Sequence, residues 1–197
     1  MKITVIQDCI DILRGKKKIL PQHFFYNFKF WLYNHNLTNF PSSTIRHFYL
    51  TKVLKYKIPK SAFVHLGCFF NCTNLIIGEN TVIGRACTIV GDVTIGKNCS
   101  ISAFNIIQSV SHDKNSKVFE AIYNPVIIED YVWTGYNSVI LDGSYLRRGC
   151  IIGACSLITG KTKTEECGVY GGVPAKKISE RDKDACVYNL NYHPVFC

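Results

Sequence analysis

An aliphatic residue returns at every sixth position over most of the chain beyond residue 76. The pattern runs in two blocks of different phase, from 77 to 107 and from 128 to 158. Its positions are Ile77, Ile83, Ile89, Ile95, Ile101, Ile107, Ile128, Thr134, Ile140, Leu146, Ile152 and Ile158. A weaker register, offset by one residue, runs through Ile58, Val64, Phe70 and Ile76. A period of six fits neither an amphipathic helix nor the alternation of a hairpin strand, and it is typical of a parallel β-helix.

In such a fold each hexapeptide is one short strand and a turn, and three of them make a triangular coil. The aliphatic side chain points into the prism, and the fourth residue after it also points inward and must be small. These small residues are Thr81, Cys87, Val93, Cys99, Asn105, Val132, Ser138, Ser144, Cys150, Ser156 and Thr162. Residues 58–107 and 126–163 therefore predict an all-β core of about five coils at roughly 18 residues a coil.

The chain has 10 cysteines in 197 residues, and no two are spaced as C-x-x-C. This spacing disfavours a structural zinc site, so we expect no metal. Cys87, Cys99 and Cys150 occupy the small inward position. We expect them to be reduced and to act as small buried hydrophobes.

Residues 108–125 carry no repeat, although the pattern resumes on both sides of them. We expect a loop ejected from one corner of the prism. Long loops in compact domains are often functional, so this loop is the first place to look for chemistry.

Several strings in and around this loop resemble one family. They are Ser111-His112-Asp113, the run 125–135 (PVIIEDYVWTG), the run 152–156 (IGACS) and the run 171–176 (GGVPAK). Together with the hexapeptide ladder they resemble the left-handed β-helix O-acetyltransferases that act on sugars. The resemblance covers residues 58–182 and is to the maltose and galactoside acetyltransferases and to the polysaccharide acetyltransferases of the colanic-acid type.

The resemblance implies a homotrimer with acetyl-CoA as co-substrate in the groove between adjacent prisms. It implies that His112 is the general base, taking the proton of a sugar hydroxyl while the oxygen attacks the thioester. Imidazole is well suited to accept that proton near neutral pH. Asp113 either orients the imidazole or caps the loop.

Further site residues follow from the same resemblance. Those expected to contact CoA are Gly135, Tyr136, Ala154, Lys176 and one of Lys161 and Lys163, whose register is shifted from the family's. Cys155 stands where the family usually has Gly. Arg85 and Asp92 are candidates for binding the acceptor, but the acceptor sugar itself is not readable from these residues.

Residues 1–57 form a different segment, because residues 1–60 carry 11 Lys and Arg against two Asp and so hold all of the net charge of +9. Ile3, Ile6, Ile10 and Leu13 predict a helix ending near Gly15. Ser42 or Ser43 could cap a second helix that continues to Leu54. These helices either cover the open end of the prism or present a basic, aromatic face to a membrane. Charge alone does not indicate nucleic-acid binding.

We predict three parts, residues 1–57, 58–182 and a tail 183–197. The sequence shows no signal peptide and no transmembrane stretch, which indicates a cytoplasmic protein, peripheral to the inner face of the membrane if residues 1–57 bind lipid. The leading function is acetyl-CoA-dependent O-acetylation of a sugar hydroxyl in surface polysaccharide biosynthesis.

Three alternatives stay open. One is a hexapeptide acyltransferase for another acceptor, such as an antibiotic, an amino sugar or serine. Another is a zinc enzyme like the β-helical carbonic anhydrases, which needs three histidines, whereas residues 58–182 hold only His65 and His112. The third is a β-helix that serves only as a scaffold.

Overall fold

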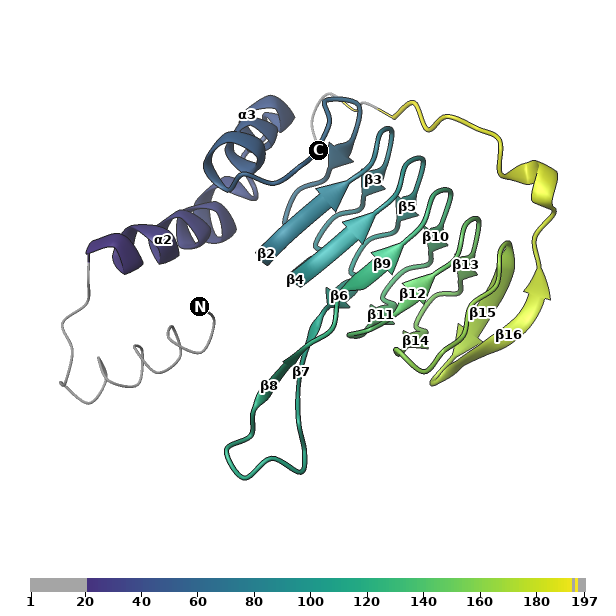
Figure 1. Cartoon of the computed structure of the whole chain (residues 1–197). Helices are drawn as coiled ribbons and strands as arrows, with labels where there is room; N and C mark the ends of the chain where they lie inside the picture. The colour runs from purple at the N-terminus through teal and green to yellow at the C-terminus, as the bar shows by residue number, and fades with distance from the viewer. Residues whose placement is uncertain (1–20, 193, 195–197) are drawn as a thin grey trace.

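A computed structural model describes residues 21–192 and 194, and it shows a parallel β-helix with helices at one end and a strand-and-tail segment at the other (Figure 1). One face is a parallel ladder in the order β1-β3-β5-β10-β13-β15. Its strands are β1 Phe63–Val64, β3 Val82–Ile83, β5 Ser100–Ile101, β10 Trp133–Thr134, β13 Ile151–Ile152 and β15 Gly168–Gly172.

The second sheet covers the other two faces because two of its strands bend around an edge. The first half of β4 pairs with β6 and the second half pairs with β9. One face thus holds β6, β11 and β14, and the other holds β9 and β12. The bounds are β2 Phe69–Ile77, β4 Thr88–Ile95, β6 Ile106–Gln108, β9 Val126–Ile128, β11 Val139–Ile140, β12 Tyr145–Leu146 and β14 Leu157–Ile158.

The parallel ladder of the first face gives the helix about six turns, one more than the sequence predicted. The additional turn is the last one, where Tyr170 in β15 takes the inward position that an aliphatic residue holds elsewhere and is buried. An aromatic at that position does not match the aliphatic pattern, so the repeat did not reveal it.

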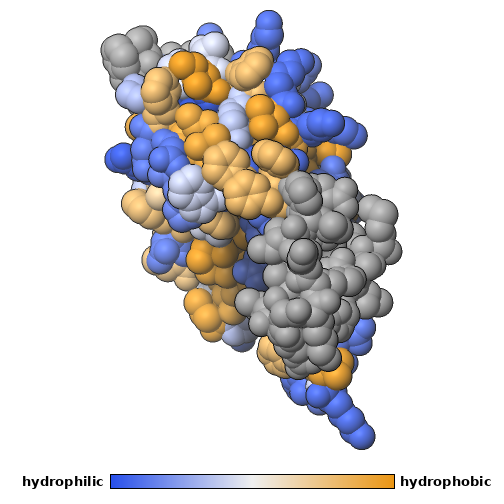
Figure 2. Space-filling model, turned by 90° about the vertical axis from the view of Figure 1, so that its left-hand side faces the viewer, coloured by the Kyte–Doolittle hydropathy of each residue, from blue (hydrophilic) through white to orange (hydrophobic). Residues whose placement is uncertain are grey.

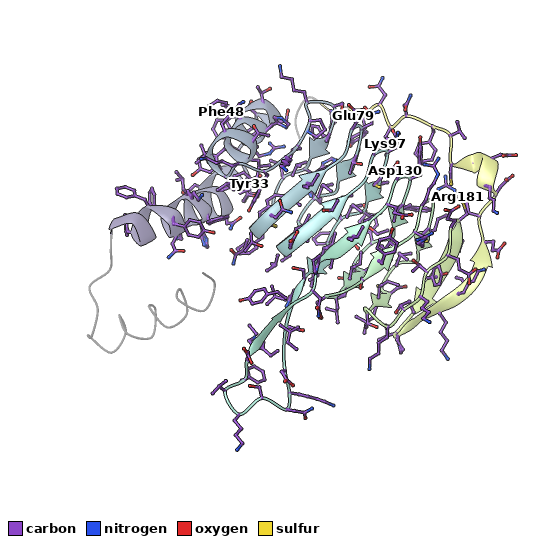
Figure 3. All side chains as sticks on the ribbon, viewed as in Figure 1. Tyr33, Phe48, Glu79, Lys97, Asp130 and Arg181 are labelled. Carbon is purple, nitrogen blue, oxygen red and sulfur yellow. The ribbon has the colours of Figure 1, made fainter. Side chains whose placement is uncertain are left out.

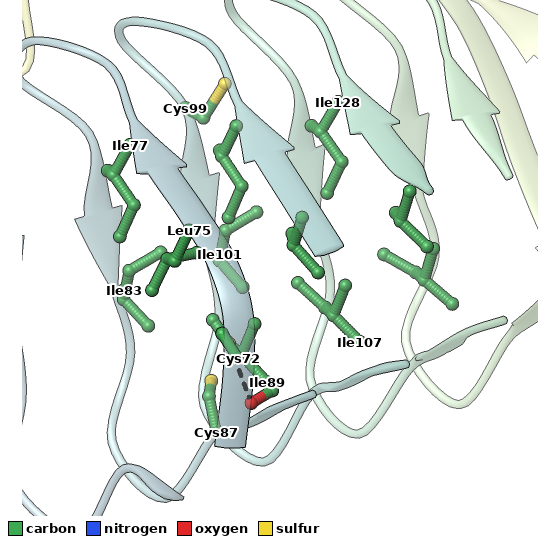
Figure 4. Packing of buried hydrophobic residues seen from close by; sticks show 14 of the residues in the cluster. Cys72, Leu75, Ile77, Ile83, Cys87, Ile89, Cys99, Ile101, Ile107 and Ile128 are labelled. Carbon is green, nitrogen blue, oxygen red and sulfur yellow. Dashed lines mark hydrogen bonds between the residues drawn. The ribbon is translucent and has the colours of Figure 1, made fainter. Parts of the chain in front are cut away.

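The interior is filled by columns of like side chains, as Figure 4 shows for the first coils. Ile83 pairs with Ile101 on the next coil, and Ile89 pairs with Ile107 in the same way. All twelve positions of the predicted period are buried. The inward direction of the repeat is therefore confirmed, and burial of these columns is the main source of stability.

A bulge explains the offset register before residue 77. Cys72 pairs with Gly91 and Asn74 with Asp92, so Thr73 is left over as an extra residue in β2. Ile58, Val64 and Phe70 of the weaker register are buried, and the extra residue places Ile77 rather than Ile76 in the interior, as the main repeat predicted.

The cysteines in the small inward positions are buried, as predicted. Cys87, Cys99 and Cys150 have no exposed surface. Their thiols donate to backbone carbonyls of the neighbouring coil, at 3.1 Å, 3.1 Å and 2.9 Å respectively. Each side chain is thus a small hydrophobe that also satisfies a polar group.

The helices at the N-terminal end cover the first coil. Helix α2 (Pro21–Leu32) continues into a π-helical turn, η1 (Tyr33–Leu37), and α3 (Ser43–Phe48) continues into η2 (Tyr49–Val53). Ser42, one of the two predicted caps, accepts a hydrogen bond from the Ile45 amide at 3.4 Å. The helix expected to end near Gly15 lies outside the described residues.

Side chains of these helices bind the backbone of the first coil. The side chain of Asn34 exchanges two hydrogen bonds with the backbone of Phe70, at 2.9 Å and 3.0 Å. The Arg46 guanidinium donates to the Val64 carbonyl at 3.1 Å. Tyr33 is fully buried and belongs to the same apolar core as the prism. The inner face of the helices therefore covers the open end, as one of the two sequence interpretations expected.

The C-terminal part closes the far end and then returns along one edge. Strand β16 (Ala175–Glu180) pairs antiparallel with β15, and a short 3-10 helix, η3 (Lys183–Ala185), follows. Arg181 donates to the Tyr131 carbonyl at 3.3 Å, and the Leu190 amide donates to Asn98 at 3.1 Å. We call this edge of the prism the tail edge, and Figure 3 labels Lys97, Asp130 and Arg181 along it. Within the described residues no helix has the length and apolar character needed to cross a bilayer.

Candidate active site

The segment without a repeat is a two-stranded arm that projects from the prism (Figure 1). It consists of β7 (Val110–His112) and β8 (Ala121–Tyr123), paired antiparallel. The arm leaves and rejoins the prism at one point, where the Asn124 amide donates to the Ser109 carbonyl at 3.1 Å. The sequence located the ejected segment but did not predict that it forms a hairpin.

His112 stands at the end of β7 with its ring held by one neighbour. Its Nδ1 lies 3.0 Å from the Phe119 carbonyl oxygen, and the two rings stack at 4.3 Å with 10° between their planes. A carbonyl oxygen can only accept, so this hydrogen bond requires the proton on Nδ1. In the neutral ring Nε2 then carries the free lone pair, which is the arrangement that a general base needs.

Asp113 makes the contacts of a turn-capping residue. Its Oδ1 accepts the Asn115 amide at 2.9 Å, and its own amide donates to the Glu120 carbonyl at 2.9 Å. The sequence left two roles open for Asp113, orienting the imidazole or capping the loop. These contacts are those of a cap. The contact that orients the imidazole comes from Phe119, which no sequence signal marked.

A row of polar side chains runs along the prism edge from which the arm projects, which we call the hairpin edge. Asn74 donates to Asp92 at 2.9 Å, and Asn124 donates to Asp142 at 2.9 Å. Between these pairs the Asp92 amide donates to the Ser109 hydroxyl at 2.6 Å. Asp92 therefore lies at the root of the arm that carries His112.

The candidate lysines Lys161 and Lys163 follow the last turn of the hairpin edge, where Gly160 stacks against Gly143. Both side chains are exposed. Only Lys163 lines a cavity of about 530 Å³, which it shares with Tyr145 and Arg147 among others. Glu165 and Glu166 also line this cavity, so its charge is mixed, and of the two lysines only Lys163 faces it.

The other predicted CoA residues lie along a different edge, which we call the glycine edge. The Gly135 amide donates to Ile152 on the next coil at 2.7 Å, and the Cys155 amide donates to the Tyr136 carbonyl at 2.8 Å. Gly171 continues this column on the last coil, and Lys176 pairs with Gly171. Gly135, Tyr136, Ala154 and Lys176 therefore form one continuous row.

Gly135 is required by the stacking of coils. A Cβ at this position would lie 2.5 Å from the Ala154 amide nitrogen, too close for any side chain. The match of Gly135 to the family is therefore explained by packing, whether or not a cofactor passes beside it.

The predicted site residues are divided between these two edges. His112, Asp113, Asp92, Lys161 and Lys163 belong to the hairpin edge, between the faces of β6 and β9. The remaining predicted residues, including the exposed Arg85, belong to the glycine edge, between the faces of β10 and β11. The third edge is covered by the C-terminal tail. A single prism therefore does not bring the two halves of the predicted site together.

No group of three His, Cys, Asp or Glu side chains that could hold a metal ion occurs among residues 21–192 and 194. The His112 imidazole can transfer protons, and carboxylate and amide groups lie at the root of the arm that carries it.

Comparison with known proteins identifies the repeat. Residues 74–109 match the family described as bacterial transferase hexapeptide (six repeats). Galactoside O-acetyltransferase of Escherichia coli K12 is 31% identical over 160 residues, covering 77% of each chain. An Escherichia coli dTDP-4-amino-4,6-dideoxy-D-glucose acyltransferase is 30% identical over 148 residues, covering 58% of this chain and 76% of the relative. The bifunctional protein GlmU of Wigglesworthia glossinidia brevipalpis is 32% identical over 105 residues, which are 53% of this chain and only 20% of that protein.

Solved structures show the same fold. A maltose O-acetyltransferase from Clostridium difficile 630 superposes with a TM-score of 0.69 at 21% identity, covering 80% of this chain and 84% of that one. AntD, an N-acyltransferase from Bacillus cereus solved with dTDP and 3-hydroxybutyryl-CoA, gives a TM-score of 0.57 at 20% identity, covering 63% and 71%.

The fold and the matched repeat define a β-helical transferase of the hexapeptide class. The chain belongs to the hexapeptide-repeat acetyltransferase family, with galactoside O-acetyltransferase among its relatives, and it is an acyltransferase.

Proposed function

We propose that this protein transfers an acetyl group from acetyl-CoA to a hydroxyl group of a sugar, in the biosynthesis of a surface polysaccharide. The observation that supports this most directly is the contact of His112 Nδ1 with the Phe119 carbonyl, because it leaves Nε2 free to accept a proton. The sugar acetyltransferases among the relatives support the class of acceptor.

In the proposed step, His112 Nε2 accepts the proton of the acceptor hydroxyl as its oxygen attacks the thioester carbonyl carbon. The new C–O bond forms, and the C–S bond breaks as the tetrahedral intermediate collapses. The imidazolium then returns the proton to the departing thiolate sulfur, which leaves as CoA with a free thiol. An alcohol is a poor nucleophile near neutral pH, so the base is needed for the attack.

We propose that the complete site forms between adjacent protomers of a homotrimer. The hairpin edge of one prism supplies His112 and Asp92, and the glycine edge of the next supplies Gly135, Tyr136, Ala154 and Lys176. The tail occupies the third edge, so these two edges are the ones left for contact between copies. Cyclic closure of identical subunits is the usual outcome of such a head-to-tail contact.

A second candidate is transfer to the amino group of an amino sugar. The relative that acts on dTDP-4-amino-4,6-dideoxy-D-glucose and the structural neighbour AntD favour this alternative. The same imidazole would take a proton from an ammonium or amine nitrogen, so the arm does not discriminate between the two acceptors. A peripheral contact of residues 1–57 with the cytoplasmic face of a membrane is also part of the proposal.

The experiment is release of free CoA thiol from acetyl-CoA, measured with a panel of neutral sugars, amino sugars, serine and aminoglycosides. Product mass and resistance to mild base distinguish an ester from an amide. Turnover only with hydroxyl acceptors supports the proposal, and amide products from amino sugars support the second candidate. Absence of turnover with every acceptor, while acetyl-CoA still binds, would overturn both.

A further inference from the structure

Helix α2 has apolar side chains on two opposite sides. Its inner side packs on the prism through Tyr33 in the following turn, which is fully buried between Tyr49 and Phe70. Phe30 is partly buried on the same core. One apolar side is sufficient to attach a helix to a protein, so the outer side requires a separate explanation.

The outer side is a continuous aromatic stripe. Phe24 stacks on Phe28 at 5.8 Å, Phe28 on Trp31 at 5.8 Å, and Trp31 lies 5.5 Å from His35. The spacing of four, three and four residues places these rings on one face of the helix. Phe24 and Trp31 both stack on Phe28, yet they remain 55% and 51% exposed. Figure 2 shows apolar side chains gathered over the end of the molecule that carries these helices.

The segment of sequence that carries the stripe is basic and holds no carboxylate. From Ile12 to Gly78 the sequence has ten Lys and Arg and no Asp or Glu. Lys29 lies on α2 with its ammonium 4.8 Å from the Tyr26 ring centre. Partial burial, and then the charge of Lys55, lower the pKa of Lys29. A basic segment without carboxylates favours an anionic partner.

We propose that the outer face of α2 binds the surface of an anionic membrane. The aromatic stripe enters the interface between headgroups and acyl chains, and the basic residues contact the lipid phosphates and carboxylates. A second copy of this chain fits less well, because it would bring a segment of the same positive charge against this one. The inference rests on the membrane contact proposed above for residues 1–57 and deepens it, but it does not depend on transferase activity, since the membrane surface recognised here need not carry the acceptor.

The two tryptophans provide a matched pair of probes. Trp31 lies in the stripe and Trp133 lies on the prism, and they are similarly exposed, at 51% and 47%. The variant Trp133→Phe reports on Trp31 alone, and the variant Trp31→Phe reports on Trp133 alone. Each full-length variant is mixed with vesicles of phosphatidylcholine containing phosphatidylglycerol, and with vesicles of phosphatidylcholine only.

We expect the Trp31 emission to shift to shorter wavelength and to be quenched by lipids brominated near the headgroup, with anionic vesicles only. The Trp133 emission should not change. Co-sedimentation should weaken severalfold at high salt, because salt screens the basic residues. The double variant Phe24→Ser/Phe28→Ser should lose binding, whereas Val187→Ser, which removes an exposed apolar side chain from the tail, should retain it.

Three results would overturn the inference. The first is no co-sedimentation with anionic vesicles at low salt. The second is a blue-shifted Trp31 emission in the absence of vesicles, which would mean that protein already covers the stripe, and a dependence on protein concentration would identify a second copy. The third is a response of Trp133 equal to that of Trp31. None of these results bears on acetyl transfer, which is measured separately with soluble acceptors.

Discussion

His112 and Phe119 face each other across the tip of the projecting arm, with their rings stacked and the His112 Nδ1 bound to the Phe119 carbonyl oxygen. The hydrogen bond fixes the tautomer and the stacking fixes the ring plane. The arm therefore presents Nε2 in one orientation although the side chain is exposed.

Replacing His112 by Ala should lower kcat by about 10²–10⁴-fold, because a positioned general base contributes that much. The matched control is Asp113→Asn, which keeps the oxygen that accepts the Asn115 amide, so its kcat should change by only a few-fold. Steady-state kinetics with acetyl-CoA and the best acceptor measure both. A His112→Ala enzyme with more than about half of the parent kcat would show that His112 is not the base.

Mixed trimers test whether the site spans two protomers. His112→Ala damages only the hairpin edge, and Ala154→Trp fills only the glycine edge, so each variant alone should be inactive. Random co-assembly of the two should restore about a quarter of the sites, in which both edges come from undamaged copies. Activity of the co-expressed mixture compared with that of separately purified variants is the measurement. A mixture no more active than its parents, or a monomer mass in light scattering, contradicts the shared site.

Thiol labelling tests the interior of the prism. Burial raises the pKa of Cys99 to about 12 and that of Cys150 to about 11. Because the thiolate is the reactive form, both should label slowly at pH 8 and faster as the pH rises toward those values. The exposed Cys155 serves as the internal control and should label within the first minutes. Mass spectrometry that finds Cys99 and Cys155 labelled at the same rate would show that the inward assignment is incorrect.

The raised pKa values also predict that stability falls as pH rises above 9.0, the ordinary thiol value.

Thr134 occupies an aliphatic position with a buried hydroxyl that has no hydrogen-bond partner among the described residues. Replacing it by Val keeps the shape and removes the unsatisfied group, so it should stabilise the fold by about 1 kcal/mol. Ser138 is the matched control, since its hydroxyl donates to the Gly153 carbonyl at 2.9 Å. Ser138→Ala should destabilise by about 1–2 kcal/mol. Chemical unfolding of both variants measures the two signs, and a destabilised Thr134→Val would mean that the hydroxyl has a partner.

The sequence determined the coil and the direction of its side chains, because both depend on a local period. Ile83, Ile101 and Cys99 point inward as a consequence of their spacing along the chain, and the position of the interrupted repeat located the arm. The resemblance of His112 and its neighbours to one family indicated the kind of chemistry.

Only the tertiary structure decided how these parts meet. The extra residue Thr73, the contact of Phe119 with His112 and the return of the tail along Tyr131 all depend on which segments lie side by side, and no period along the chain encodes that. The division of the predicted residues between two edges has the same origin, because residues 18 positions apart stack on one edge while residues six positions apart lie on different faces. The sequence therefore specified each coil, and the stacking of coils decided which side chains can act together.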